Sequence, residues 1–123
     1  MTDTTPVFDD APLFMPGEVF SLSDAVDHRE EPWFNQSLVA ANDSVLRVAR
    51  LHGRFHHHSH DTDELFYVLD GAMEIEIDGE VHALKAGQGV TVPAGTVHRT
   101  AADEPATVLL VAAREASMAG VRA

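Results

Sequence analysis

The sequence predicts an all-β protein whose strands form an antiparallel jelly-roll β-barrel. Short apolar segments follow one another at regular spacing between residues 38 and 112, and clusters of Gly, Pro, Asn and Asp separate them. Several of these segments alternate apolar and polar residues, which is typical of strands with one buried face. The same region has no convincing helical pattern. Together these observations indicate about eight or nine short strands.

The length of 123 residues is that of one domain. Residues 1–16 combine three prolines with Asp and Thr, which predicts a flexible N-terminal arm. Residues 17–113 are expected to form the barrel domain, and residues 114–123 a C-terminal tail or short helix. Near the start of the domain we expect an edge strand at residues 19–22. Trp33 and Phe34 are expected to form an apolar plug that caps the barrel mouth or, as we prefer, covers a sheet face.

The remaining strands are bounded by turn residues. The clearest turn is Asp78-Gly79, because a two-residue type I′ hairpin needs positive φ at both central positions. A further reversal is expected at residues 101–105, which end in a proline. The expected strands are 37–41, 45–51, 65–69, 73–77, 81–84, 90–92, 97–100 and 107–112.

Composition limits the kinds of site and partner that the chain can have. It has no cysteine, so any metal ion must be held by nitrogen and oxygen ligands. The formal net charge of −12 repels phosphate backbones and anionic lipids, so neither nucleic acid nor a membrane is expected as a partner. We find no secretory signal and no apolar run of the roughly 18 residues that a membrane-spanning helix needs. A cytoplasmic protein is therefore expected.

Four of the eight histidines lie within five positions, and their spacing indicates a metal site. On a strand, His56, His58 and His60 would share one face, while His57 would point the other way. Glu64 follows across a short polar turn and could lie beside the imidazoles. His98 comes just after a Pro-Ala-Gly turn and could approach from a neighbouring strand. Three imidazoles and a carboxylate suit a divalent transition metal and leave coordination positions open.

Two stretches of the sequence resemble the two motifs of the cupin superfamily. Residues 53–71 are similar to G-x5-H-x-H-x3,4-E-x6-G, although Gly53 lies one residue too close to the first histidine. Residues 87–98 match G-x5-P-x-G-x2-H at every fixed position, and the asparagine that closes this motif in the family is Ala102 here. The resemblance covers residues 45–112. It implies a cupin-like double-stranded β-helix.

The resemblance also implies a ligand set and an assembly. The implied metal ligands are His58, His60, Glu64 and His98, near the mouth of a conical barrel. The implied cofactor is one divalent metal ion, Fe, Mn, Ni or Zn. Many small members with a single barrel are homodimers, so a homodimer is expected. Superfamily membership does not decide the reaction, because this fold hosts many chemistries.

The function expected from these residues is that of a metalloenzyme acting on a small organic molecule, of dioxygenase, isomerase or cyclase type. Glu64 is the candidate catalytic base, because a carboxylate can change its mode of coordination. His56 and Phe66 are candidates for substrate binding. The alternative is a non-catalytic barrel that binds a sugar or metabolite and uses the metal as an anchor or a structural staple. A metal-free barrel is disfavoured, because adjacent buried imidazoles without partners are costly.

Overall fold

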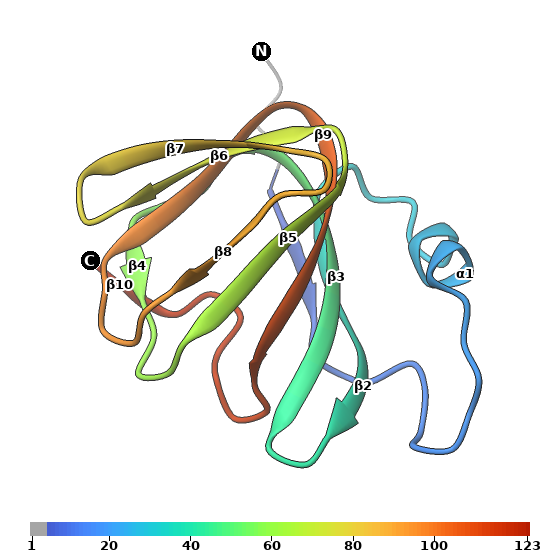
Figure 1. The fold of residues 1–123 in the computed structure, drawn as a ribbon. Coiled ribbons are helices and arrows are strands. Elements are labelled where there is room, and N and C mark those ends of the chain that lie inside the picture. Colours follow the sequence, from blue (N-terminus) through green and yellow to red (C-terminus); the bar gives the residue numbers. More distant parts are fainter. Residues whose placement is uncertain (1–4) are drawn as a thin grey trace.

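The computed structural model describes residues 5–123, and these residues contain ten strands and one short helix (Figure 1). The predicted all-β fold is confirmed: the strands belong to one strongly curled sheet. No helix in this part of the chain has the length and apolar character needed to cross a membrane. The elements are β1 (Val7–Asp9), α1 (Leu22–Asp27), β2 (Phe34–Ala41), β3 (Ser44–Arg54), β4 (His58–Ser59), β5 (Glu64–Asp70), β6 (Ala72–Ile77), β7 (Glu80–Lys85), β8 (Gly89–Val92), β9 (His98–Ala113) and β10 (Val121–Arg122).

The long strand β9 joins the two halves of the curled sheet. One of its edges pairs with β3 along most of its length. Its other edge pairs first with β6 and then with β5, all antiparallel. β7 extends the sheet beyond β6, and β8 extends it beyond β5. At its beginning β9 also pairs with β4, at His58 opposite His98. The sheet therefore curls around an interior, and these two histidines lie opposite each other where β4 meets β9.

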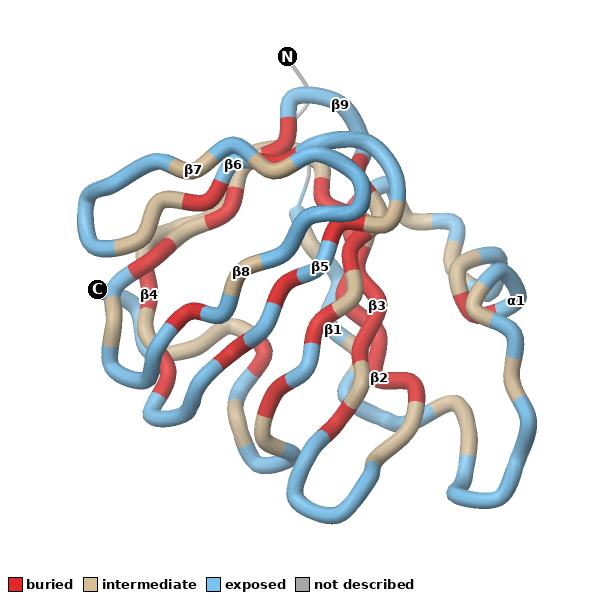
Figure 2. The backbone as a smooth tube through the Cα atoms, in the orientation of Figure 1, coloured by how far each residue is buried: buried red, intermediate tan, exposed pale blue. Residues whose placement is uncertain are grey.

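Two apolar clusters lie on opposite faces of the curled sheet. The interior cluster is built from β3, β5, β6, β8 and β9, and its fully buried members include Val68, Ile75 and Val108. The second cluster lies on the outer face, where residues of the N-terminal segment and α1 pack against Phe34, Leu38 and Val48. Figure 2 shows the buried residues as an alternating pattern along the strands. That alternation follows from the period of two in strand geometry.

Most strand positions agree with the sequence prediction, and the exception lies in β9. The expected reversal at residues 101–105 is absent, and the expected strands 97–100 and 107–112 are parts of one strand. Asp103, Glu104 and Pro105 are exposed and form a bulge, since the register with β3 jumps from Leu51–Ala106 to Gly53–Ala102. Their turn-like composition thus marks a bulge rather than the end of a strand. The Asp78-Gly79 turn is as predicted, with φ values of 50° and 83°.

The region before β2 differs most from the sequence prediction. The edge strand expected at residues 19–22 is wrong, because the helix α1 begins at Leu22. Leu22, Ala25 and Val26 have the spacing of one helical face, and this face packs into the outer cluster. Asp24 lies in the first turn, where a negative charge favours a helix.

The N-terminal segment is attached to the barrel over much of the part that the structure describes. β1 pairs in parallel with the start of β2, and the amides of Leu13 and Phe14 donate hydrogen bonds to carbonyls of β2. Residues 7–14 therefore contact the barrel, and residues 1–4 lie outside the described residues. The flexibility of the arm stays a prediction. The boundaries of the barrel domain stay a prediction.

We expect Val108→Ala to destabilise the barrel by about 2 kcal/mol, because it removes buried methyl groups and leaves a small cavity. Val108 is fully buried in the interior cluster. Val81→Ala is the matched control, since Val81 is 57% exposed on β7, and it should cost less than about 0.5 kcal/mol. The measurement is urea unfolding of both variants. Equal losses of stability would contradict the assignment of the interior core.

Candidate metal centre

The structure brings together four side chains that the sequence analysis proposed as metal ligands. One ligand atom from each lies within 4.8 Å of each of the others, and all four residues are buried. They come from three places in the fold: the β4 region, the start of β5 and the start of β9. The residues are His58, His60, Glu64 and His98.

Local pairing explains why these side chains meet. His58 lies opposite His98 in the register of β4 and β9. The loop before β9 is tied to the first motif, because the amide of Gly95 donates to the carbonyl of His60 over 2.7 Å. The amide of Ala94 donates to Oδ1 of Asp63 over 2.8 Å. The two sequence motifs are therefore joined by backbone contacts, and not only by the side chains of the cluster.

Backbone carbonyls orient two of the imidazoles. Nδ1 of His58 lies 3.0 Å from the carbonyl oxygen of His56, and Nδ1 of His98 lies 2.9 Å from that of Thr96. A proton on each Nδ1 satisfies these carbonyls and leaves Nε2 as a lone-pair donor. This arrangement is the usual way in which proteins set the tautomer of a metal-binding histidine.

The electrostatics of the cluster favour the protonation states that a metal ion needs. Burial lowers the pKa of the His58 imidazole to about 4, so this ring is neutral at pH 7. Burial alone would raise the pKa of Glu64, but the adjacent imidazoles of His60 and His98 outweigh it and lower the pKa to about 2. The site therefore offers the neutral imidazole of His58 together with the ionised carboxylate of Glu64.

The donor set fits a divalent ion. Nε2 of His60 is buried and lacks a hydrogen-bond partner among the described residues, although Oε1 of Glu64 lies 3.2 Å away. Oε1 of Glu64 also lies 3.3 Å from Nε2 of His98. An unpartnered buried nitrogen costs free energy that a bound cation would recover. Three nitrogens and one carboxylate oxygen match Fe, Mn, Ni or Zn.

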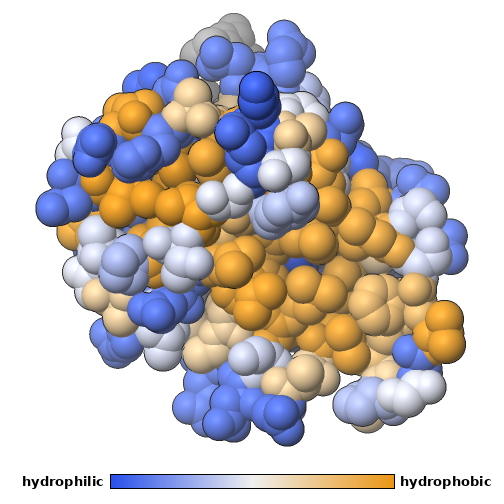
Figure 3. Space-filling view, viewed as in Figure 1, coloured by the Kyte–Doolittle hydropathy of each residue, from blue (hydrophilic) through white to orange (hydrophobic). Residues whose placement is uncertain are grey.

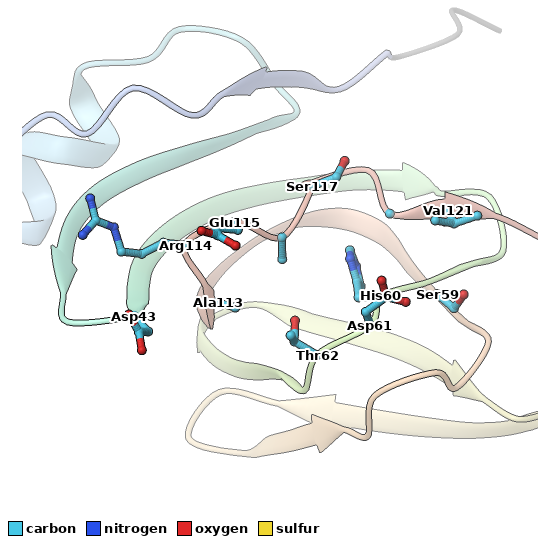
Figure 4. A pocket seen from close by; sticks show the side chains of 12 residues that line it. Asp43, Ser59, His60, Asp61, Thr62, Ala113, Arg114, Glu115, Ser117 and Val121 are labelled. Carbon is cyan, nitrogen blue, oxygen red and sulfur yellow. The ribbon is translucent and has the colours of Figure 1, made fainter.

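The cluster lies between an inner cavity and an outer groove. The inner cavity has a volume of about 40 Å³, and both His58 and Glu64 line it. Its remaining wall is largely apolar and includes Trp33, Phe66 and Met118. The outer groove has a volume of about 920 Å³, and His60 lines it. Figure 4 shows this groove between residues 59–62 on one side and the chain after β9 on the other.

The C-terminal segment crosses the barrel next to the cluster. β10 pairs with β4, and the amide of Ala123 donates to the carbonyl of His57. Gly120 lies so close that a Cβ atom there would be 2.6 Å from Cδ2 of His58 and 3.0 Å from Cε1 of His60. Its φ of 68° also disfavours other residues. The segment expected to be a tail or short helix thus ends in a strand against the cluster.

A buried arginine, Arg47, forms a hydrogen bond with the C-terminal segment before it reaches the cluster. Arg47 is fully buried. Its Nη2 donates to the carbonyl of Ala116 and to Oδ1 of Asp10, each over 3.2 Å. Its Nε donates to Oγ of Ser37 over 3.3 Å. Arg47 therefore links the N-terminal segment, β2 and the C-terminal segment, and does not line the cavity as a substrate carboxylate ligand would.

Sequence similarity agrees with this geometry. Residues 47–112, more than half of the chain, match the family model Cupin_2, which is described as a cupin domain. The chain belongs to the cupin superfamily. This cupin also resembles the crystal structure of a cupin-2 domain containing protein from Shewanella frigidimarina, with a TM-score of 0.71 and 26% identity. That match covers 76% of this chain and 92% of the other chain.

Two curated proteins are similar to this cupin over part of their length. The uncharacterized protein YdbB of Bacillus subtilis (strain 168) is 42% identical over 73 residues, which is 58% of this chain and 65% of YdbB. The polyketide synthase CurC of Streptomyces cyaneus is 36% identical over 55 residues, which is 44% of this chain and 36% of CurC. The matched region therefore spans less than two thirds of either relative.

The other candidate residues are placed differently by the structure. Phe66 is buried and lines the inner cavity, as its parity with Glu64 predicts. His56 does not line this cavity, because β4 begins only at His58 and the strand alternation does not reach back to it. The His56 ring packs on Phe55, with centroids 4.0 Å apart. Substrate binding by Phe66 or His56 stays a prediction.

The cavity-lining residues that sequence reasoning did not single out include Asn35, Thr100 and Met118. Asn35 precedes the expected strand, and Met118 lies in the expected tail. Trp33 and Phe34 both line the cavity, and Phe34 also belongs to the outer cluster. The expected plug therefore contacts the inner cavity as well as the outer cluster. His57 contacts Glu76 outside the cluster, with Nε2 2.5 Å from Oε2, in agreement with its opposite parity.

We expect the metal-free protein to lose stability as the pH falls from about 6.5 towards 4, in part because of His58. The unfolded chain binds a proton on this ring near its ordinary pKa of 6.5, whereas the folded chain does so only at about 4. In that window the unfolded state binds more protons, so acid favours unfolding. Urea unfolding at pH 7 and pH 5 should show a smaller loss for His58→Gln than for wild type. Ser59→Ala removes no titrating group and should keep the wild-type loss, and an unchanged loss in His58→Gln would refute the assignment.

Proposed function

We propose that this cupin binds one divalent metal ion through His58, His60, Glu64 and His98 and acts with it on a small organic molecule. The observation that carries this proposal is the convergence of four buried donor atoms within 4.8 Å of one another. The pKa values of His58 and Glu64 support it, since the neutral imidazole and the ionised carboxylate can bind a cation without a costly change of charge. Fe, Mn, Ni or Zn would suit this donor set.

A bound ion in such a site supplies Lewis-acid chemistry and, if the metal is redox-active, electron transfer. The surrounding residues set what can react there. Phe66, Trp33 and Met118 give the inner cavity an apolar lining, and electrostatic interactions are stronger beside apolar surface than in water. We propose Glu64 as the group that accepts a proton from the substrate, because its carboxylate is ionised and lines this cavity.

The reaction types that fit are those of a dioxygenase, an isomerase or a cyclase. One relative, CurC, carries the name of a polyketide synthase. Polyketide chains are rich in carbonyl groups, which a divalent ion can polarise towards the enolate. We therefore propose an enolisable carbonyl compound as the substrate class, with only its reacting group of a few atoms inside the inner cavity. The alternative proposal is a barrel that binds a sugar or metabolite without turnover.

An activity screen separates these proposals. Oxygen uptake by Fe-loaded protein with enolic substrates would identify a dioxygenase, and turnover of the same substrates by Zn-loaded protein would identify an isomerase or cyclase. Saturable thermal stabilisation by sugars, without any turnover, would favour the binding protein instead.

Alanine variants of two adjacent histidines, His58 and His57, test the proposed ligand set. We expect His58→Ala to weaken metal affinity by about 100-fold or more, because it removes a direct ligand from the site. His57→Ala should leave metal affinity unchanged, because its imidazole contacts Glu76 outside the cluster. The measurement is Co²⁺ titration with elemental analysis of the purified proteins. Full metal content in His58→Ala would contradict the proposed ligand set.

A homodimer is proposed on an exposed apolar face. Leu65, Tyr67 and Val111 are each more than a third exposed, and they come from the neighbouring strands β5 and β9. The N-terminal segment and α1 cover the adjacent part of this outer face but not these residues. Figure 3 shows the apolar area on the side where β3 and β5 lie. Uncovered apolar surface of this kind is typical of protein contacts.

We expect Tyr67→Glu to convert the dimer to a monomer, since it places a charge in the centre of this apolar face. Light scattering after size exclusion measures the mass directly. Val81→Glu, on the exposed strand β7, is the control and should remain dimeric. A wild-type protein of 13.3 kDa at micromolar concentration would exclude the dimer.

A further inference from the structure

Asn35 is a buried polar residue that the fold does not use. It is 8% exposed, and its Oδ1 atom has no hydrogen-bond partner among the described residues. It lines the same inner cavity as His58 and Glu64. Its position in β2 lies opposite Ala49 of β3, which belongs to the interior cluster, so both side chains face the inside of the barrel.

The next residue on β2 shows what a structural amide looks like in this protein. Gln36 is fully buried on the opposite face. Its Oε1 accepts a hydrogen bond from Nε of Arg29 over 2.9 Å, and its Nε2 donates to the carbonyl of Ala11 over 3.0 Å. Both ends of the Gln36 amide are therefore used, one to hold the N-terminal segment at Ala11 and one to hold Arg29 after α1. In contrast to Gln36, the amide oxygen of Asn35 has no hydrogen-bond partner among the described residues.

An unpaired buried amide is unfavourable for folding. An apolar residue of similar size would fill the same space without leaving a polar atom unpartnered. Such a group in a native interior needs a partner that is absent from the chain itself, a water molecule or a ligand. The cavity beside Asn35 has a volume of about 40 Å³, which exceeds the roughly 10–15 Å³ needed for one water molecule and is far below that of a drug-sized pocket.

We propose that Asn35 selects the ligand of the metal centre: its side-chain amide forms a hydrogen bond with a small oxygen- or nitrogen-containing molecule held beside His58 and Glu64. The inference rests on the proposed metal site and names a recognition residue within it. An amide can donate through its NH₂ group or accept through its oxygen, so Asn35 recognises a coordinated anion as well as a hydroxyl group. Apart from the metal ligands, Thr100 is the other polar residue among those that line this cavity, so few side chains compete with Asn35 for a hydrogen bond to the ligand.

The size of the cavity limits this ligand. Met118, on the C-terminal segment, forms part of the wall and is 9% exposed. In this arrangement the cavity accepts a molecule of only a few atoms. Azide is a suitable probe, because it is small and anionic and binds open positions of divalent metals.

The test compares Asn35→Leu with Gln36→Leu in Co²⁺-loaded protein. We expect Asn35→Leu to weaken azide binding about tenfold, which corresponds to one hydrogen bond, and to leave Co²⁺ content unchanged. The metal-free variant should unfold at the same temperature as wild type or at a higher one. Gln36→Leu should show the reverse, with lower stability and wild-type azide affinity. Azide affinity is read from the visible spectrum of Co²⁺.

Two outcomes would overturn the inference: unchanged azide affinity in Asn35→Leu, or a loss of stability in the metal-free variant, which would make Asn35 structural. If the wild-type protein binds no Co²⁺, the proposed function itself fails and this inference fails with it. Retained Co²⁺ with unchanged azide affinity, in contrast, removes only the role of Asn35.

A measurement on wild-type protein covers the case in which a variant does not fold. The chain has two asparagines, Asn35 and Asn42, and Asn42 lies in an exposed turn. In Zn²⁺-loaded protein we expect azide to shift the NMR signals of the Asn35 side-chain amide and not those of Asn42. An Asn35 amide that does not respond to saturating azide would overturn the proposal.

Discussion

The antiparallel pairing at the beginning of β9 is the interaction on which the site depends. It sets His98 opposite His58, although 39 residues lie between them in the sequence. The same strand then pairs with β3 on one edge and with β5 on the other. Glu64 is the first residue of β5. One strand thus fixes the distance between the two halves of the ligand cluster. A shift of its register by one residue would turn His98 out of the interior, because strand side chains alternate between faces.

The barrel and the ligand cluster could be predicted because their signals are local. Asp78-Gly79 specifies its hairpin through the two positive φ values, and the alternation around Ile75 specifies which face is buried. The spacing of the histidines and Glu64 within residues 58–64 fits one strand, one turn and the start of the next strand. Only His98 needed information from a distant segment, and the second motif supplied it through its Pro-x-Gly-x2-His pattern.

The parts that could not be predicted depend on tertiary contacts. Nothing near Arg47 in the sequence indicates a buried arginine, because its partners are Asp10 and the carbonyl of Ala116, far away along the chain. No sequence pattern marks Asn35 as a candidate site residue, because its proposed role depends on the cavity that it lines. The bulge in β9 resembles a turn in composition, and only pairing with β3 on both sides of it shows that the strand continues. The buried arginine, the buried asparagine and the bulge are all exceptions to the local sequence rules for a regular apolar barrel.

The late position of β9 in the chain has a consequence for biogenesis. The β6–β7 hairpin joins residues that are close in sequence, and such contacts form rapidly. The pairs between β3 and β9 join segments about 60 residues apart, and contacts of this range slow folding. On the ribosome, most of the barrel is synthesised before the strand that closes it has emerged. The nascent chain therefore exposes His58, His60 and Glu64 without their fourth partner, and metal capture by the complete cluster must follow barrel closure.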